Sequence, residues 1–489
     1  MGAFPCLVRE CLCGTVEVVP TALSNETSFT KPLARLGLAA AIAFSTACVP
    51  KSAGPVAPVP KSPHGPIAEA KPYRCGRLLE SDEIAARKIL TRAYEAWRRL
   101  YVTGQGARGA LRIRRPEDND DTVSEGIAYG MLIAAYHGDR AIFDGLFAYA
   151  KARLDGNGLM HWKINSEGRV TGGGAASDAD EDMAIALIVA EKLWGAPYGE
   201  LARRLIDSIY ESEIEPGTFV MKPGDGWGGS LVTNPSYFDP AYFKVFAEYT
   251  GNKNWLKVVD RSYRMLDLVA SHNQGTGLIP DWMTAGAGPA KGQSYDYKWD
   301  AARVPLRIAR DAAWFCEPRA EKLLAPLNEF FRQQGPLTIG DGYKLSGEKF
   351  STVHAAAFVG PVAAASLFSK NDDFRKTLWT DLLKRWGGGY YSNHLRHLSI
   401  LFVTGLFPNP LEMTLAKIGD NDANRGSDSK LAQPAGPSAP NSSNAPEPPM
   451  APKTGDTGTI PAAAPPPDSD ASIPKPPESA ANPAPKGPE

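Results

Sequence analysis

The spacing of apolar residues predicts helices along most of the chain. Leu90, Tyr94, Trp97 and Tyr101 recur at intervals that place them on one face of a helix. Similar spacing predicts further helices at residues 123–137, 140–154, 178–194, 198–210, 240–250, 255–271, 300–315, 320–333, 353–369, 372–385 and 395–406. The alternating pattern typical of strands is rare. We therefore expect one large all-α domain over residues 73–418, built from paired helices and glycine-rich loops.

The first 48 residues have a different pattern, which is typical of an export signal. Lys31 and Arg35 precede an apolar run at residues 36–44 that is too short to span a bilayer. The following Ser-Thr-Ala-Cys sequence is similar to a lipoprotein processing box, in which Cys48 would become the acylated first residue. An internal apolar helix is the alternative. We expect an exported protein that is periplasmic, attached to the outer membrane as a lipoprotein, or extracellular.

Two segments beside the predicted domain have compositions that do not support a packed core. Residues 49–72 are rich in proline and predict an extended linker. Residues 419–489 contain no aromatic side chain, and Pro, Ala, Ser and Asp dominate them. Such a segment buries too little apolar surface to offset the loss of chain entropy. We interpret it as a disordered tail.

Charge and cysteine content narrow the class of protein. A formal net charge of -1 gives no electrostatic basis for binding nucleic acid or an anionic membrane surface. Of the six cysteines, Cys75 and Cys316 fall within the predicted domain. They could form a disulfide in an exported protein, and two free buried thiols are the alternative. Cys11 and Cys13 lack a second Cys/His pair at the spacing of a zinc site.

The most unusual stretch is residues 175–194, where four acids open an apolar helix. Asp178, Asp180, Glu181 and Asp182 fall in the first turns, after Ser177, which can cap the helix. The simplest interpretation is that the acids complement the helix dipole. Three glycines before the helix favour a second interpretation, because they allow a ligand to come close to it.

Two further acids stand at comparable places. Glu125 opens the apolar helix at residues 123–137, where Gly126 and Gly130 leave space beside it. Asp300 follows an aromatic stretch and precedes Arg303 by one turn, which would keep this carboxylate ionised and oriented. The nearby Asp296 is an alternative for the same position.

These three segments resemble glycoside hydrolase family 8. The resemblance rests on Ala-Ser-Asp-Ala-Asp-x-x-Met-Ala from Ala176, on Ser-Glu-Gly-x-x-Tyr-Gly-Met from Ser124, and on Trp-Asp-Ala-Ala-Arg-Val-Pro from Trp299. It covers about residues 73–410 and implies an (α/α)6 barrel, a toroid of six inner and six outer helices. The resemblance also implies that Glu125 is the general acid and Asp300 the general base.

A glycosidase needs one protonated and one ionised carboxyl group beside the bond that it cleaves. The resemblance gives Asp178 a third task, which is to hold the sugar at the cleavage point in a distorted ring shape. Its negative charge would also keep Glu125 protonated near neutral pH if the two lie close together. Asp180 is expected to brace the helix. The position of Asp300 is that of the endoglucanase and xylanase branch and argues against chitosan as the substrate.

A long glucan has flat apolar faces that stack on aromatic rings. Trp162, Trp227, Tyr237 and Trp282 lie in loops rich in Gly or Pro, so we expect them to bind substrate together with Arg303. Each ring taken alone is more typical of a core residue.

Other motifs do not support a different chemistry. The three glycines at residues 172–174 lack the Gly-Lys-Ser/Thr of a phosphate loop, and the acids after them would repel an anion. His394 and His397 lie three apart without an evident third ligand, so core or surface histidines are the better interpretation. No Gly-x-Ser-x-Gly elbow is present. We expect no metal and no cofactor.

The sequence thus predicts an inverting endo-hydrolase of β-1,4-glucan such as cellulose. An endo-β-1,4-xylanase or a mixed-linkage glucanase is the alternative within this class. An inactive carbohydrate-binding or envelope scaffold protein is the alternative outside it. We expect a monomer that works beside a cellulose-synthesis apparatus or as a scavenging cellulase.

Overall fold

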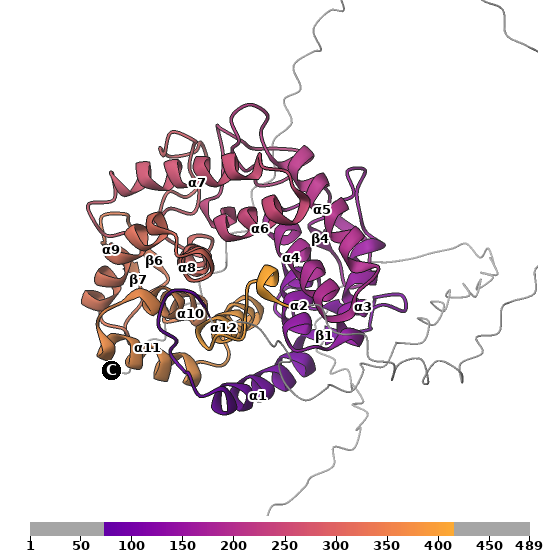
Figure 1. Cartoon of the computed structure of the whole chain (residues 1–489), viewed down its shortest axis with the longest axis horizontal. Helices are drawn as coiled ribbons and strands as arrows, with labels where there is room; N and C mark the ends of the chain where they lie inside the picture. The colour runs from indigo at the N-terminus through magenta and orange to yellow at the C-terminus, as the bar shows by residue number, and fades with distance from the viewer. Residues whose placement is uncertain (1–72, 415–489) are drawn as a thin grey trace, which may run out of the picture. The chain divides into compact units, whose positions relative to one another are not determined.

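The computed structural model describes residues 73–414, in which twelve α-helices form a double ring (Figure 1). The outer helices are α1 (Glu83–Tyr101), α3 (Arg140–Lys151), α5 (Tyr198–Glu213), α7 (Trp255–Ala270), α9 (Pro318–Gln334) and α11 (Asp372–Lys384). The inner helices are α2 (Ser124–Tyr136), α4 (Ser177–Trp194), α6 (Pro240–Thr250), α8 (Val304–Phe315), α10 (Ala356–Ala365) and α12 (Gly389–Val403). The predicted (α/α)6 barrel is confirmed.

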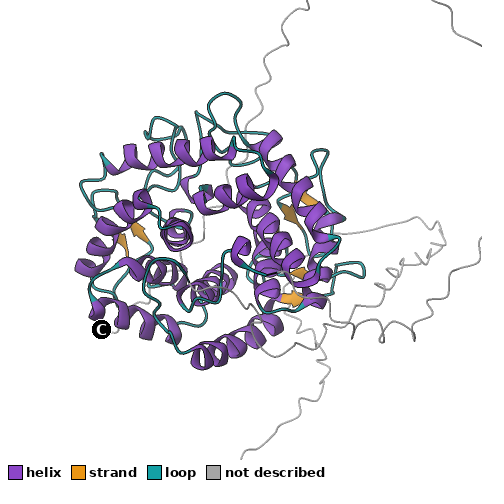
Figure 2. Ribbon diagram, viewed as in Figure 1, coloured by secondary structure: helices purple, strands orange, loops and turns teal. Residues whose placement is uncertain are grey.

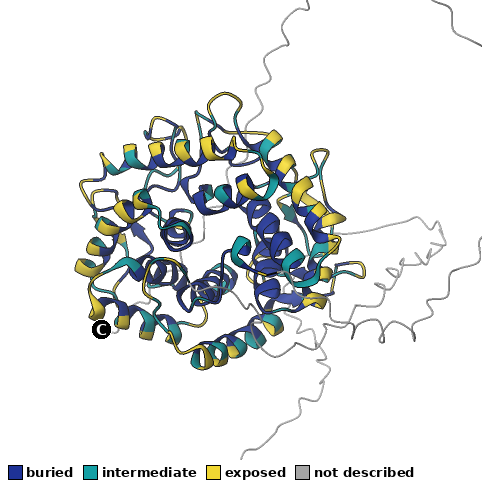
Figure 3. Cartoon of the chain, in the orientation of Figure 1, coloured by how far each residue is buried: buried dark blue, intermediate teal, exposed yellow. Residues whose placement is uncertain are grey.

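The two rings differ in how their helices are buried. The outer helix α1 buries Leu90, Tyr94 and Trp97 while Lys88 and Arg92 face water, as expected of an amphipathic helix. The inner helices α2 and α10 are buried at almost every position and are apolar on all sides. Figure 3 shows this division, with most exposed residues on the outer helices and the loops. The apolar pattern of these three helices therefore agrees with the layer in which each lies.

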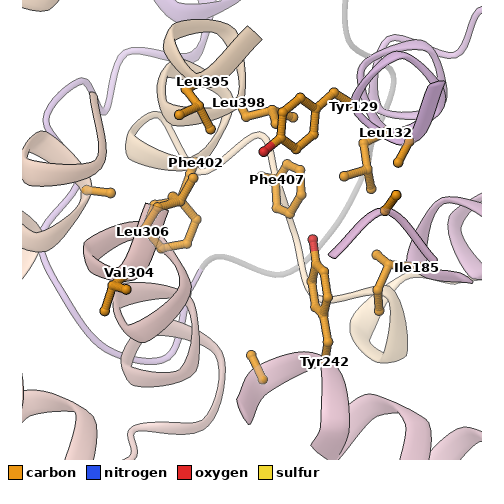
Figure 4. Packing of buried hydrophobic residues seen from close by; sticks show 14 of the residues in the cluster. Tyr129, Leu132, Ile185, Tyr242, Val304, Leu306, Leu395, Leu398, Phe402 and Phe407 are labelled. Carbon is orange, nitrogen blue, oxygen red and sulfur yellow. The ribbon is translucent and has the colours of Figure 1, made fainter. Parts of the chain in front are cut away.

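The inside of the ring is filled with large side chains. Figure 4 shows Tyr129 of α2, Tyr242 of α6 and Phe402 of α12 directed toward the ring centre, where Phe407 joins them. Each of these four residues has an exposed fraction of at most 2%. The barrel therefore has a packed core below any site at its mouth.

Seven short strands lie among the helices of the described region (Figure 2). They are β1 (Val102–Thr103), β2 (Arg112–Ile113), β3 (Thr122–Val123), β4 (Lys163–Ile164), β5 (Val170–Gly172), β6 (Gly342–Tyr343) and β7 (Lys349–Ser351). Strands β3, β4 and β5 form an antiparallel sheet in that order, with Val123 opposite Lys163 and Lys163 opposite Gly172. Because β3 leads directly into α2 and β5 precedes α4, this sheet fixes the starts of both helices.

Short 3-10 helices complete the fold: η1 (Pro235–Tyr237), η2 (Ala301–Arg303), η3 (Ser366–Phe368) and η4 (Pro410–Glu412). The first and last helices, α1 and α12, pack against each other and close the ring. Two hydrogen bonds reinforce the closure: the Tyr73 hydroxyl donates to the Phe407 carbonyl at 3.1 Å, and the Leu79 amide donates to the Val403 carbonyl at 3.0 Å. Of the two states considered for Cys75 and Cys316, the structure has the disulfide.

Two local predictions were wrong. Ser177 does not cap α4, because its hydroxyl donates to the Lys222 carbonyl at 2.7 Å and the helix already begins at Ser177 itself. The last helix was predicted from residue 395 and begins at Gly389 instead. Three successive glycines at residues 387–389 adopt left-handed backbone angles and turn the chain into α12 earlier than its apolar pattern indicates.

The predictions for the two ends of the chain lie outside the described residues. They concern the signal and lipidation at Cys48, the linker at residues 49–72 and the tail at residues 419–489, and they stay predictions. Within residues 73–414, no helix combines the length and the apolar character needed to cross a membrane.

Candidate active site

Three carboxylates from different parts of the chain meet at one buried arginine. Arg303 Nη1 donates to Glu125 Oε2 at 3.0 Å and to Asp178, and its Nη2 donates to Asp300 Oδ1 at 2.9 Å. The guanidinium holds its nitrogens in a rigid planar fork, so the contacting oxygens of Glu125 and Asp300 lie within about 8 Å of each other. The three acids singled out in the sequence therefore belong to one site, and Arg303 lies at its centre.

The fold places all three acids at the beginnings of helices. Glu125 and Asp178 are the second residues of the inner helices α2 and α4, and Asp300 immediately precedes η2, which continues into α8. Unpaired amides at a helix start make it a favourable place for negative charge. The inner helices bring these starts together at one mouth of the ring.

Glu125 has the electrostatics of a proton donor. Burial raises the pKa of its carboxyl to about 7, and the negative charge of Asp178 adds to the rise. Arg303 opposes the rise, as does the hydroxyl of Tyr390, which donates to Glu125 Oε1 at 3.0 Å. The carboxyl consequently keeps a large protonated fraction near neutral pH.

Asp300 differs from Glu125 in its access to solvent. Its side chain is 35% exposed, compared with 19% for Glu125 and 4% for Asp178. Partial burial raises the pKa of Asp300, while Arg303 and the indole of Trp282, which donates to Asp300 Oδ2 at 3.0 Å, oppose this rise. A carboxylate that is both oriented and open to water is suited to activate a water molecule.

A buried carboxyl beneath Asp300 went unnoticed in the sequence. Asp281 Oδ1 accepts hydrogen bonds from the backbone amides of Ala301 at 2.8 Å and Lys298 at 3.2 Å. These two residues flank Asp300, so Asp281 holds the turn that carries it. Burial and the nearby charge of Asp300 raise the pKa of Asp281 to about 7. The sequence drew attention to the Trp282 beside it rather than to this acid.

Tyr390 and Tyr391 were also missed, because the start of α12 was predicted too late. The hydroxyl of Tyr391 donates to the Trp299 carbonyl at 2.8 Å. The guanidinium carbon of Arg303 lies 5.9 Å from the ring centre of Tyr391 and 5.1 Å from that of Tyr237. These contacts place Arg303 between two aromatic rings, a favourable environment for a cation.

The four aromatic residues expected to bind substrate are all reachable from solvent. Trp162 and Trp227 are 41% and 47% exposed, and Trp282 and Tyr237 are partly buried. The rings of Trp227 and Trp282 stack with centres 5.7 Å apart, and Tyr237 meets the edge of Trp282 at 6.4 Å. Since Trp282 also contacts Asp300, three of the four form one aromatic surface beside the acids.

The remaining acids of α4 point elsewhere. Asp180 accepts from the Met160 amide at 3.4 Å, and burial raises its pKa. Glu181 and Asp182 contact Arg307, which also bonds to Asp239 at 3.2 Å. We call Glu181, Asp182, Asp239, Arg307 and Arg310 the inner cluster.

The two histidines of α12 have separate partners. His394 Nε2 accepts from the Trp97 indole at 2.8 Å, whereas His397 lies 2.9 Å from His137. No group of three or more His, Cys, Asp or Glu side chains within residues 73–414 is arranged to hold a metal ion.

A ring of paired helices with carboxyl groups gathered at the starts of its inner helices defines a helical-barrel glycoside hydrolase. The sequence pattern of the glycosyl hydrolases family 8 matches residues 77–405, and the chain belongs to this family. Endoglucanase A of Acetivibrio thermocellus is 46% identical over 363 residues, which cover 72% of this chain and 74% of that protein. Endoglucanase C of Ruminiclostridium cellulolyticum is 41% identical and covers 69% of this chain and 75% of its own length.

A solved structure gives the same fold. The β-1,3-1,4-glucanase of Paenibacillus sp. X4 superposes with a TM-score of 0.66 at 26% sequence identity. The match covers 70% of this chain and 99% of that one. The family resemblance predicted from the three acidic segments is thereby confirmed.

Proposed function

We propose that the chain is an inverting endo-β-1,4-glucanase in which Glu125 is the general acid and Asp300 the general base. The observation that carries the proposal is the shared contact of Glu125, Asp178 and Asp300 with Arg303. The names of the relatives at 41% and 46% identity, both endoglucanases, support the reaction and the substrate class.

In the proposed reaction, the Glu125 carboxyl donates its proton to the glycosidic oxygen as the bond to the sugar carbon breaks. Asp300 takes a proton from a water molecule that attacks the same carbon from the opposite face. Inverting enzymes separate their two carboxyl groups by roughly 6.5 to 9.5 Å to admit this water. The limit of about 8 Å set by the Arg303 fork leaves room for that arrangement.

Asp178 has a supporting part in this proposal. Asp178 and Glu125 both accept a hydrogen bond from Nη1 of Arg303. The negative charge of Asp178 is therefore close to Glu125 and raises the proton affinity of its carboxyl group. Its free oxygen Oδ1 is buried and has no partner among the described residues. We assign that oxygen to the hydroxyl groups of the sugar at the cleavage point.

The aromatic surface of Trp227, Trp282 and Tyr237 gives the glucan a platform next to the acids, and Trp162 lies near the start of α4 across a loop. Aromatic stacking suits the apolar faces of pyranose rings and tolerates different linkages. A mixed-linkage glucan is therefore the second candidate substrate, supported by the similarity of the fold to the Paenibacillus β-1,3-1,4-glucanase.

The test is release of reducing ends from carboxymethyl cellulose, mixed-linkage glucan, xylan and chitosan by residues 73–418. We expect cellulose or mixed-linkage glucan to be cleaved, and Glu125→Gln and Asp300→Asn to lose about a thousandfold or more in kcat at unchanged Tm. Asp296→Asn is the matched control, since Asp296 is the neighbouring acid and pairs instead with Lys344 at 3.1 Å.

Proton NMR of the first product distinguishes the stereochemistry. The α-anomer, formed before mutarotation, is the expected product of a β-linked substrate. A β-anomer would mean a retaining mechanism and a different task for Asp300. If the wild-type protein is inactive on all four polymers, the scaffold alternative is favoured. Full activity of Asp300→Asn would show that a residue other than Asp300 is the general base.

We also propose that the protein is exported and anchored through lipidated Cys48. The Ser-Thr-Ala-Cys sequence and the basic residues before the apolar run support this proposal. Labelling with a fatty-acid analogue should mark the full chain and leave Cys48→Ser unmarked.

A further inference from the structure

Tyr390 contacts the proposed acid and has little freedom to move. Its hydroxyl donates to Glu125 Oε1 at 3.0 Å, and its backbone amide donates to the carboxylate of Glu117. The ring lies against Gly126, where an added Cβ would come within 2.7 Å of the hydroxyl oxygen. The glycine after the acid is therefore required by the close approach of Tyr390.

His394 holds Tyr390 from the other side. Its Nδ1 lies 2.8 Å from the Tyr390 carbonyl oxygen, and the two ring centres are 4.5 Å apart. Nε2 of the same ring accepts from the indole nitrogen of Trp97 at 2.8 Å. Because an indole N–H only donates, Nε2 carries the lone pair and the proton stays on Nδ1, which donates to the carbonyl.

The chain of contacts thus runs from an outer helix to the acid. It begins at Trp97 on α1, passes through the fixed tautomer of His394 on α12 and ends at Tyr390, whose hydroxyl meets Glu125 on α2. Trp97 and His394 are both fully buried, so water does not compete for these hydrogen bonds.

We propose that His394 is a positioning residue for the general acid, acting through Tyr390 in a tautomer set by Trp97. The inference rests on the proposed role of Glu125 and extends it to a side chain that does not touch the substrate. It also assigns a function to His394, which the sequence alone indicated to be a core or surface histidine.

His397 provides a matched control within the same helix. It is as buried as His394, and its ring forms a hydrogen bond with His137 rather than with Tyr390. Because both rings are fully buried, we expect either histidine-to-phenylalanine replacement to disturb the core to a similar degree. Only the replacement of His394 removes the hydrogen bond to the Tyr390 carbonyl.

The readout is the basic limb of kcat/KM against pH on a soluble cello-oligosaccharide, which reports loss of the Glu125 proton. The groups that face this carboxyl are Arg303, Asp178, Arg115, Tyr129 and Tyr390. The Tyr390 hydrogen bond favours the ionised form of Glu125, so losing it raises the pKa and moves the limb to higher pH.

We expect His394→Phe and Tyr390→Phe each to move the limb up by roughly one pH unit. His394→Phe should also lower kcat roughly tenfold, with KM within about twofold. The double variant should move the limb no further than Tyr390→Phe alone, since both act on one hydrogen bond. His394→Asn, which retains a donor toward the carbonyl, should recover part of the shift, and His397→Phe should leave the limb in place.

The proposal is overturned if Tyr390→Phe moves the limb and His394→Phe does not, or if His397→Phe moves it equally. Should His394→Phe fail to fold, Trp97→Phe removes the donor to Nε2 and must produce a smaller shift in the same direction. Activity that survives in Glu125→Gln would instead refute the assignment of the acid, independently of the histidine.

Discussion

Two clusters of arginine and carboxylate lie one above the other in the barrel, and they differ in balance and in access. At the mouth, one cation, Arg303, meets three carboxylates, of which Asp300 is 35% exposed. In the inner cluster, Arg307 pairs with Glu181, Asp182 and Asp239, and Arg310 pairs with Asp239. None of these side chains is more than 4% exposed.

The comparison shows what separates a reactive site from an electrostatic brace built of the same groups. Arginines in both clusters come from one helical stretch around α8, and acids in both come from the start of α4. An excess of carboxylate near solvent keeps protons available for transfer, whereas the acids of the inner cluster are closed to solvent and cannot exchange protons with a substrate.

The largest expected effect comes from two acids one turn apart on α4, each 4% exposed. Asp178→Asn should lower kcat by about a hundredfold to a thousandfold at an unchanged Tm, because the mouth has carboxylate in excess. Asp182→Asn should lower Tm by several degrees and leave kcat within about threefold. Kinetic and thermal-unfolding measurements on both variants check this prediction. A loss of kcat in Asp182→Asn at an unchanged Tm would show that the inner cluster also takes part in the reaction.

The two arginines allow a second test. Arg303→Lys keeps the charge and loses the planar fork that reaches three acids, so kcat should fall about a hundredfold. Arg307→Lys should instead cost about 3 kcal/mol of unfolding free energy, measured in urea, because a lysine cannot reach all three buried acids and leaves at least one of them unpaired. Equal kinetic losses in the two variants would show that both clusters take part in the reaction.

Asp281 allows a third test of the cluster at the mouth, because it holds the turn that carries the proposed base, Asp300. Asp281→Ala removes the oxygen that orders the turn around Asp300, and kcat should fall roughly tenfold. Asp281→Asn keeps an acceptor oxygen and should stay within about twofold of the wild type. If the asparagine variant is as impaired as the alanine variant, the charge of Asp281 matters rather than its hydrogen bonds.

The smallest expected effect concerns stability against pH. Burial raises the pKa of Glu125 and of Asp281 to about 7 in the folded state, above the values of unfolded carboxyls. The folded protein therefore binds more protons than the unfolded chain, and its stability should decline as pH rises from about 5 through 7. Tm should fall by a few degrees over that range, with a shallower slope in Glu125→Gln. A Tm that rises with pH would contradict the raised pKa values.

The sequence predicted the acids that meet at Arg303 but not the residues that hold them in place, and the reason is physical. Glu125, Asp178 and Asp300 each stand in a short local pattern, and helix periodicity showed which segments face inward. Tyr390 contacts Glu125, and Asp281 contacts the turn around Asp300. Both contacts join different segments of the chain, and helix periodicity does not encode such contacts. Asp182 was visible as an acid, but its pairing with Arg307 required knowing that α4 and α8 belong to one ring.

Local errors had local causes. The left-handed glycines at residues 387–389 moved the start of α12 forward, and the contact of Ser177 with Lys222 replaced an expected helix cap by a tertiary hydrogen bond. Tertiary contacts commonly override capping preferences in this way.

Closure of the ring by α1 and α12 also sets the order in which the enzyme is completed during its synthesis. Tyr390 follows Glu125 by 265 positions, so the hydroxyl that supports the acid emerges from the ribosome long after it. A nascent chain that lacks α12 has neither a closed ring nor a finished proton donor. The cluster around Arg303 and the contact of Tyr390 with Glu125 are thereby completed only after α12 has been made.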